Sequence, residues 1–227
     1  MLLVSFLSIL VIGYLLGSIP FGLIISRRKA RIDIRQFGSG KTGATNVLRT
    51  MGVKAAVLVA VLDLLKGMVA VILAGWLFRH DQLLMVGDFS IGALLAQVLA
   101  ALAAVAGHNW PIFHRFKGGR GVATYFGGLM ALYPPAALFG GEALIVSAGL
   151  TRYASLGSIV GAVGACGILV PLTLMHGFPA EYLGYASVGG AVIIAMHKDN
   201  IVRLWKGKER KLGEKAETGK SPEQIAR

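Results

Sequence analysis

The chain has 227 residues, of which 55% are hydrophobic and only 15% are charged, and its mean hydropathy is +0.68. This composition excludes a soluble globular protein and indicates an integral membrane protein. The net charge of +12 does not indicate nucleic-acid binding, because the basic residues lie between and after apolar segments without interleaved aromatic residues. The single cysteine, Cys166, excludes a disulfide framework and a C-x-x-C metal pair.

Apolar segments recur along the whole chain and predict an all-α polytopic membrane protein with about seven transmembrane helices. In chain order they are 1–25, 53–78, 91–106, 121–133, 136–150, 156–175 and 182–196. The fourth and fifth are separated by Pro134 and Pro135, and each spans only about 20 Å as a helix, less than the ~30 Å of a bilayer core. We therefore expect these two helices to be short, tilted or partly buried.

Basic residues predict the orientation. They follow the first segment, as Arg27, Arg28 and Lys29, and none precedes it, so this segment is predicted to be a span rather than a cleaved signal. The N-terminus is then outside and the C-terminus in the cytoplasm. Of the 23 Lys and Arg, all except Arg79 and Lys66 lie on the predicted cytoplasmic side. Residues 1–211 are expected to form one transmembrane domain, and 212–227 a mobile basic cytoplasmic tail.

The loop 36–49, after the first segment, has the features of a phosphate-binding loop. Its glycines free the backbone to turn N–H groups toward one point, while other residues supply hydroxyl groups and positive charge: Gly38, Gly40, Gly43, Ser39, Thr42, Thr45, Lys41 and Arg49. A nucleotide-hydrolysing P-loop is disfavoured, because Arg35 stands where the leading glycine should be. A basic loop that touches anionic lipid headgroups stays an alternative.

A second loop, 107–121, repeats this chemistry after the third segment. Gly118, Gly119 and Gly121 are bracketed by Lys117 and Arg120. Free N–H groups at the start of a helix, with the helix dipole behind them, form an anion site. The alternative is that the glycines only permit a tight return into the fourth segment.

His197 and Asn200 end the seventh segment three residues apart, so they share a face on a continuing helix. A neutral histidine can take a proton from a hydroxyl group, and an amide can bind phosphate or hydroxyl groups. A histidine that only interacts with helix-end carbonyls is the alternative. Within the second segment, Asp63 and Lys66 form either a functional site or an ion pair that steadies the helices. His108 and His114 lack nearby carboxylates at metal-ligand spacing, so no metal site is predicted.

These loops resemble the signatures of the bacterial integral-membrane acyl-phosphate:glycerol-3-phosphate acyltransferases. Those signatures run approximately G-S-G-N-x-G-A-T-N-x-x-R, G-H-x-[FYW]-P-x-F-x-x-F-K-G-G-K-G-V-A-T and H-x-x-N-I-x-R-L-x-x-G-x-E, and here they fall at 38–49, 107–124 and 197–209. The resemblance covers nearly the whole chain. Lys41 stands in place of the usual Asn, Arg120 in place of Lys, and Met196 where an Arg often precedes the histidine.

The resemblance implies transfer of a fatty acyl group from acyl-phosphate to the sn-1 hydroxyl of glycerol 3-phosphate, giving lysophosphatidic acid and phosphate, the first acylation of phospholipid biosynthesis. It implies a multi-pass enzyme of the bacterial cytoplasmic (inner) membrane, in contact with membrane lipid, whose active site faces the cytoplasm. Because an acyl-phosphate is a mixed anhydride with a good leaving group, positioning and charge neutralisation suffice, without a cofactor or metal.

The site residues carried over from the resemblance fall into two groups. The catalytic residues are His197, Asn200, Ser39 and Arg49. The substrate-binding residues are Lys117, Gly118, Gly119, Arg120, Gly121, Ser155, Gly38, Gly40, Thr45, Asn46 and His108, with Ser158 as the alternative to Ser155. Arg49, Lys117, Ser155, His197 and Asn200 are assigned to glycerol 3-phosphate, and the loop 118–121 to the acyl-phosphate.

The competing hypothesis is a transporter or exchanger of small phosphorylated anions. It is disfavoured, because the sequence has no detectable inverted repeat and no polar outer vestibule. The chain also lacks the H-x-x-x-x-D motif of other glycerol-3-phosphate acyltransferases and a Ser/His/Asp arrangement for a covalent acyl-enzyme. Direct single-step transfer is therefore predicted, with His197 or a substrate phosphate as the proton acceptor.

Overall fold

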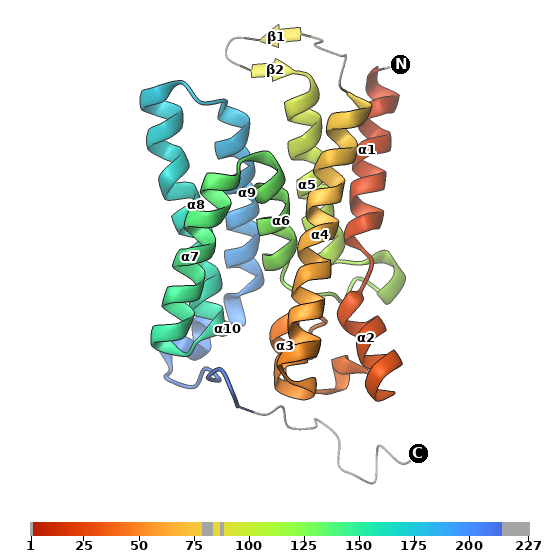
Figure 1. The fold of residues 1–227 in the computed structure, drawn as a ribbon, viewed down its shortest axis with the longest axis vertical. Helices are drawn as coiled ribbons and strands as arrows, with labels where there is room; N and C mark the ends of the chain where they lie inside the picture. Colours follow the sequence, from red (N-terminus) through yellow and green to blue (C-terminus); the bar gives the residue numbers. More distant parts are fainter. Residues whose placement is uncertain (1, 79–83, 87–88, 215–227) are drawn as a thin grey trace.

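The computed structural model describes residues 2–78, 84–86 and 89–214, and this part of the chain is almost entirely helical (Figure 1). The helices are α1 (Leu2–Gly17), α2 (Phe21–Ala30), α3 (Ala44–Met51), α4 (Val53–Leu77), α5 (Ala93–Asn109), α6 (Val122–Leu132), α7 (Pro134–Thr151), α8 (Ala154–His176), α9 (Ala180–Met196) and α10 (Lys198–Trp205). Two 3-10 turns, η1 (Ile34–Gln36) and η2 (Ile112–His114), lie in the first and second loops. Each of the seven predicted apolar segments contains a helix.

Four helical stretches are long and apolar enough to cross a membrane: Val4–Ala30, Val53–Leu77, Ala93–His114 and Ala154–His176. The helices α6 and α9 are apolar but shorter. The short length expected for the fourth segment is confirmed by the 11 residues of α6, whereas α7 reaches 18 residues because Pro134 and Pro135 occupy its first turn instead of preceding it.

The predicted span over 1–25 lies within the stretch Val4–Ala30, which is interrupted by a short break. The helix α1 ends at Gly17, and α2 begins at Phe21 after a short break. Pro20 explains the break, because it lacks an N–H group and its ring clashes with the preceding turn of a helix. The break turns the carbonyl oxygen of Ile19 toward α4, where it accepts a 3.0 Å hydrogen bond from Lys66 Nζ.

The strands β1 (Leu84–Val86) and β2 (Phe89–Ile91) form an antiparallel hairpin, so the fold is not strictly all-α. Ile91, predicted to begin the third apolar helix, pairs with Leu84, and α5 begins at Ala93. Arg79 lies outside the described residues. So does most of the predicted tail, except 212–214, where Leu212 N–H donates a hydrogen bond to the carbonyl oxygen of Arg152.

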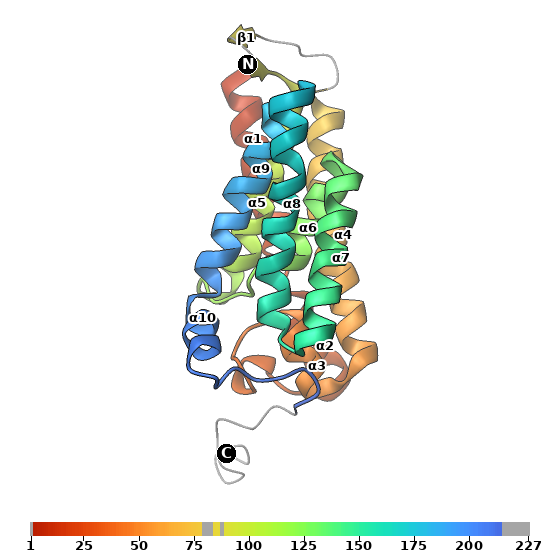
Figure 2. The same cartoon turned by 90° about the vertical axis from the view of Figure 1, so that its left-hand side faces the viewer.

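The long helices run side by side along the longest axis of the molecule (Figures 1 and 2). The hairpin lies at one end, while α2, α3 and α10 gather at the other end, where the first and second loops also lie. Glycines allow two pairs of helices to pack closely. A Cβ atom on Gly127 of α6 would overlap the backbone of Leu64 in α4, and one on Gly161 of α8 would lie 2.7 Å from the carbonyl oxygen of Gly140 in α7.

Candidate functional site

Asn46 holds the first loop in shape. Its side-chain Nδ2 lies 2.9 to 3.1 Å from the carbonyl oxygens of Ile34, Phe37 and Lys41, and its Oδ1 accepts a 3.1 Å hydrogen bond from the N–H of Ser39. The side chain is buried, and all these partners belong to the loop. Asn46, predicted to bind substrate, therefore has its amide engaged in organising the loop that carries Ser39 and Lys41.

The glycines of this loop have the conformations that the turn requires. Gly38 and Gly40 adopt φ of 56° and 68°, which side chains disfavour. The N–H of Gly40 donates to the carbonyl oxygen of Phe37, so this donor closes the turn. Ser39, Lys41 and Thr45 of this loop line the large cavity described below.

The second loop differs from the predicted cradle. The N–H groups of Gly118 and Gly119 donate to the carbonyl oxygens of Asn109 and His108, so neither is available to an anion. A side chain on Gly119 would overlap Nε2 of His108, which explains the glycine at this position. The prediction that these two N–H groups are exposed was wrong, because the loop folds back on α5 instead of opening into the site.

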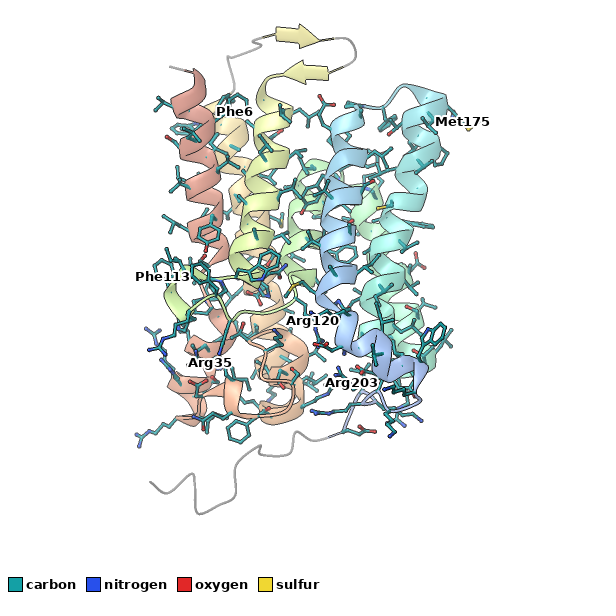
Figure 3. The ribbon with its side chains drawn as sticks, turned by 180° about the vertical axis from the view of Figure 1, so that it is seen from behind. Phe6, Arg35, Phe113, Arg120, Met175 and Arg203 are labelled. Carbon is teal, nitrogen blue, oxygen red and sulfur yellow. The ribbon has the colours of Figure 1, made fainter. Side chains whose placement is uncertain are left out.

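The loop nevertheless directs one cation into the site. Arg120 follows the tied glycines and lines the cavities, whereas the Lys117 side chain is exposed and lines neither of the two cavities described below. Gly121 then adopts φ of 76° and begins α6. Figure 3 shows Arg120 beside the ribbon at the end of the long helices, with Arg203 on α10 farther along. The sequence alone could not decide which of the two cations faces inward.

A buried ionic cluster of Asp63, Lys66 and His108 contacts the start of this loop. Lys66 Nζ lies 2.8 Å from Asp63 Oδ1, so these two residues form the ion pair that was one of the two alternatives for them. His108 Nδ1 lies 3.5 Å from the same carboxylate oxygen, and all three side chains are buried. The cluster therefore connects α4 to the break after α1, through the carbonyl oxygen of Ile19, and to the second loop, through His108.

The loops and helices enclose a cavity of about 530 Å³. One part is polar and is lined by the first loop, the second loop and the end of α9, including Ser39, Lys41, Thr45, Asn46, Asp63, His108, Arg120 and His197. The other part is apolar and is lined by α4, α6 and α7, including Ala60, Val61, Leu64, Val122, Ala123, Phe126, Leu144, Ile145 and Ala148. This confirms the predicted convergence of the loops and gives a site that suits an amphiphile.

A smaller, polar recess of about 20 Å³ adjoins this cavity. It shares Thr45, Arg120, Ser158 and His197 with the large cavity and adds Arg49, Ser155, Asn200 and Glu209. Ser155 lies in the first turn of α8 instead of in a turn before it, and its side chain is buried. All four predicted catalytic residues thus line one of two adjoining cavities: Ser39, Arg49, His197 and Asn200.

Arg120 and Arg49 contribute two cations to the lining of the recess. Within the described residues, no salt bridge joins either arginine to a carboxylate, and the Nε atoms of both are buried without a hydrogen-bond partner. Burial lowers the pKa of Arg120 to about 10, and the cations of Arg203 and Arg49 act in the same direction. Arg120 remains charged at neutral pH, so a bound anion would supply the missing partner.

His197 presents an unprotonated ring nitrogen to the cavities. Its Nδ1 lies 2.8 Å from the carbonyl oxygen of Ile193, which can only accept, so Nδ1 carries the hydrogen and Nε2 has the free lone pair. Burial and, second, the cation of Arg120 lower the pKa of His197 to about 4. The imidazole is therefore neutral at pH 7, and it lines both cavities.

Glu209 was not predicted as a site residue, although it ends the third signature. Its Oε1 accepts hydrogen bonds from Ser155 Oγ at 2.9 Å and Asn200 Nδ2 at 2.6 Å, and its Oε2 accepts one from Arg203 Nε at 2.8 Å. Burial acts to raise its pKa, but the hydrogen bonds from Asn200, Arg203 and Ser155 leave that pKa below its ordinary value. The sequence feature that pointed to it is the place of this carboxylate nine residues after Asn200, in a segment whose other charged residues are mostly cationic.

The comparisons with known proteins agree with this geometry. The family model described as glycerol-3-phosphate acyltransferase matches residues 7–207. The chain belongs to the glycerol-3-phosphate acyltransferase family. It is 61% identical to glycerol-3-phosphate acyltransferase 3 of Dehalococcoides mccartyi strain CBDB1 over 216 residues, covering 95% of this chain and 100% of that protein. It is 43% identical to the glycerol-3-phosphate acyltransferase of Halalkalibacterium halodurans over 211 residues, covering 92% of this chain and 97% of that one.

A solved structure also matches this acyltransferase. It is the crystal structure of PlsY, an integral membrane glycerol 3-phosphate acyltransferase, in its glycerol 3-phosphate form. The TM-score is 0.79 at 39% sequence identity, and the match covers 92% of this chain and 96% of that chain. The same protein in its lysophosphatidic acid form matches with a TM-score of 0.77 at 38% identity. The acyltransferase described here is thus a membrane-embedded bacterial enzyme with the PlsY fold.

Proposed function

We propose that this enzyme transfers a fatty acyl group from an acyl-phosphate to the sn-1 hydroxyl of glycerol 3-phosphate, producing lysophosphatidic acid and inorganic phosphate. The observation that carries the proposal is the cavity of about 530 Å³, whose polar part holds Arg120 and His197 and whose apolar part lies between α4, α6 and α7. Both substrates bring a phosphate, and one also brings an acyl chain. The relatives named above act on glycerol 3-phosphate according to their names, which supports the acceptor.

We assign glycerol 3-phosphate to the polar recess together with the adjoining polar part of the large cavity, and the acyl-phosphate to the rest of the large cavity. Arg49 and Arg120 neutralise phosphate charge, while Asn200 and Ser155, oriented by Glu209, border the acceptor. The acyl chain lies along the apolar part, so that its carbonyl carbon meets the polar end. Such placement lowers the activation barrier, because it holds the two reacting groups close together and correctly oriented. Proximity and orientation can contribute several kcal/mol.

The reaction then needs one displacement. The sn-1 hydroxyl oxygen attacks the acyl carbonyl carbon, a new C–O ester bond forms, and the bond between that carbon and the phosphate oxygen breaks. The hydroxyl proton passes to His197 Nε2, and phosphate leaves with the bonding electron pair. A phosphate oxygen of a substrate is the alternative proton acceptor, and the pH profile discussed below separates the two. Ser39 and Lys41, which also line the large cavity, stabilise the leaving group in this proposal.

The membrane topology is part of the same proposal. Seven helices cross the bilayer, the N-terminus is outside, and the site opens to the cytoplasm through the end that carries α2, α3 and α10. The basic residues around that end, including Arg27, Arg28 and Lys29 in the last turn of α2, support this orientation. The enzyme is accordingly placed in the cytoplasmic membrane, where soluble glycerol 3-phosphate reaches it.

The purified protein in detergent, given glycerol 3-phosphate and either palmitoyl-phosphate or palmitoyl-coenzyme A, tests the proposal. We expect lysophosphatidic acid with palmitoyl-phosphate only. Product from palmitoyl-coenzyme A alone would overturn the donor assignment. No product from either donor, with folded protein that still binds glycerol 3-phosphate, would favour the transporter hypothesis. Cysteine accessibility on the two faces of membrane vesicles tests the topology, and labelling of the α3 end from the outer side would contradict it.

A further inference from the structure

One wall of the apolar part of the large cavity has no role in the reaction at the polar end. This wall is the face of α7 that carries Gly141, Leu144, Ile145 and Ala148. Figure 1 shows α6 between α4 and α7, and α4 contributes Ala60, Val61 and Leu64 to the opposite wall. The spacing of the α7 residues is that of one face of a helix.

Gly141 marks the far end of this wall. It lies seven residues before Ala148, which corresponds to about 10 Å along the helix axis. Ala148 is near the end of α7 that meets the site, because Ala154 and Ser158, which follow in α8, also line the cavity. An acyl chain that starts at the polar end and follows α7 therefore reaches Gly141 only when it is long.

Packing does not explain the glycine at this position. A Cβ atom built on Gly141 meets no heavy atom within 4 Å, whereas one built on the neighbouring Gly140 lies 2.6 Å from the carbonyl oxygen of Gly161. Gly140 is thus required for the contact between α7 and α8, but Gly141 is not. Glycine in the middle of a helix is less favourable than alanine, and Gly141 has an ordinary helical backbone. What the missing side chain leaves is space at the edge of the cavity.

We propose that Gly141 is a specificity-determining residue that keeps the far end of the groove open and thereby allows long acyl chains. This inference rests on the proposed function, because it assumes that the apolar part holds the acyl chain of the donor. A branched side chain at residue 141 enters the path of a long chain and leaves the path of a short chain free. The substitution should therefore change the preference between donors and leave the chemistry intact.

The test compares kcat/KM for palmitoyl-phosphate and decanoyl-phosphate in wild type, Gly141→Leu and Gly149→Leu. Gly149 is a matched control, because it also lies in α7, also has no heavy atom within 4 Å of a built Cβ, and does not line the cavity. We expect Gly141→Leu to lower the palmitoyl-to-decanoyl ratio about tenfold, in the range by which pockets discriminate methylene groups. Gly149→Leu should leave the ratio within about twofold of wild type.

Equal effects on both donors, or the same change in both variants, would overturn the inference. Gly141→Ala and Gly141→Val extend the test if the leucine variant does not fold, and the ratio should then fall in the order of side-chain size. An inactive wild type with both acyl-phosphates would instead overturn the proposed function. If wild type is active with both donors and the donor ratio is unchanged in every residue-141 variant, only the role of Gly141 is overturned.

Discussion

Asn200 Nδ2 donates a 2.6 Å hydrogen bond to Oε1 of Glu209, and the same oxygen accepts a hydrogen bond from Ser155. Two residues assigned to the acceptor substrate are thus oriented by one buried carboxylate that comes from the segment after α10. The N–H of Leu212 donates a hydrogen bond to the carbonyl oxygen of Arg152, and the guanidinium of Arg152 donates one to the carbonyl oxygen of Leu212. These two hydrogen bonds tie the segment to the turn before α8. The segment after α10 thus contributes Glu209 to the lining of the polar recess.

The first prediction concerns Glu209. Glu209→Gln keeps one acceptor oxygen but loses the negative charge. Its new NH₂ group is a hydrogen-bond donor, and it replaces an oxygen that accepts from another donor, either Asn200 or Arg203. We expect it to lower the free energy of unfolding by about 1 to 3 kcal/mol and to raise the KM for glycerol 3-phosphate. Thermal unfolding in detergent and steady-state kinetics measure the two effects. An unchanged KM in a destabilised variant would show that the carboxylate has no role in orienting Asn200.

The same carboxylate gives a pH dependence. The pKa of Glu209 in the folded protein is below its ordinary value, so its contribution to stability is present above the ordinary glutamate pKa of about 4.3. That contribution is lost as the pH falls through the lowered pKa. Thermal stability measured between pH 6 and pH 3 should fall more steeply in wild type than in Glu209→Gln. Parallel curves would argue against this assignment.

The second prediction concerns His197, which is neutral because its pKa is lowered to about 4. If Nε2 accepts the hydroxyl proton, kcat/KM stays constant from about pH 8 down to about pH 5 and falls only near pH 4, far below the ordinary histidine pKa of about 6.5. His197→Asn should lose about 10² to 10⁴-fold in kcat. A fall in rate centred near pH 6.5 that persists in His197→Asn would instead point to a substrate phosphate, whose second ionisation lies in that range.

The stability contribution of His197 has the same sign as that of Glu209. A lowered histidine pKa means that the unfolded chain binds the proton first, so the contribution is present above about pH 6.5 and is lost as the pH falls toward 4. His197→Asn removes this dependence. Comparison of the two variants over pH 7 to pH 5 separates the groups, because Glu209 does not titrate there.

The third prediction concerns Arg120. Arg120→Gln removes the half-buried cation that lines both cavities, and we expect kcat/KM to fall about 10²-fold, the cost of about 3 kcal/mol for a lost charged hydrogen bond. Arg120→Lys keeps the charge and should retain activity within about tenfold of wild type. Lys117→Gln is the control, since that side chain is exposed and lines neither cavity, and it should stay within about twofold. A larger loss for Lys117→Gln than for Arg120→Gln would reverse the assignment.

The fourth prediction concerns the ionic cluster behind the site. Asp63→Asn leaves Lys66 buried without a carboxylate and should cost about 3 to 5 kcal/mol of stability. The double variant Asp63→Asn with Lys66→Met removes both charges and should recover most of that loss. Thermal unfolding in detergent measures both. A double variant less stable than Asp63→Asn would contradict the view that the pair acts as a unit.

The sequence allowed the helical segments and the convergence of the polar loops to be predicted, because hydropathy and charge report where the chain meets lipid or water. It did not show how backbone donors are used. Gly118 and Gly119 have the composition of a cradle, but their N–H groups bind the end of α5, and only the tertiary fold determines this. Likewise the place of Glu209 at the end of the third signature did not show that its carboxylate accepts a 2.6 Å hydrogen bond from Asn200. Pro20 is the residue in the sequence that accounts for the break after α1.

The most direct measurement follows phosphate and lysophosphatidic acid together in one reaction of the purified enzyme with glycerol 3-phosphate and palmitoyl-phosphate. The proposal predicts one phosphate released for each lysophosphatidic acid formed, and the loss of both products in folded His197→Asn and Arg120→Gln. Phosphate release without lysophosphatidic acid, or undiminished formation of both products in those variants, would contradict acyl transfer at this site.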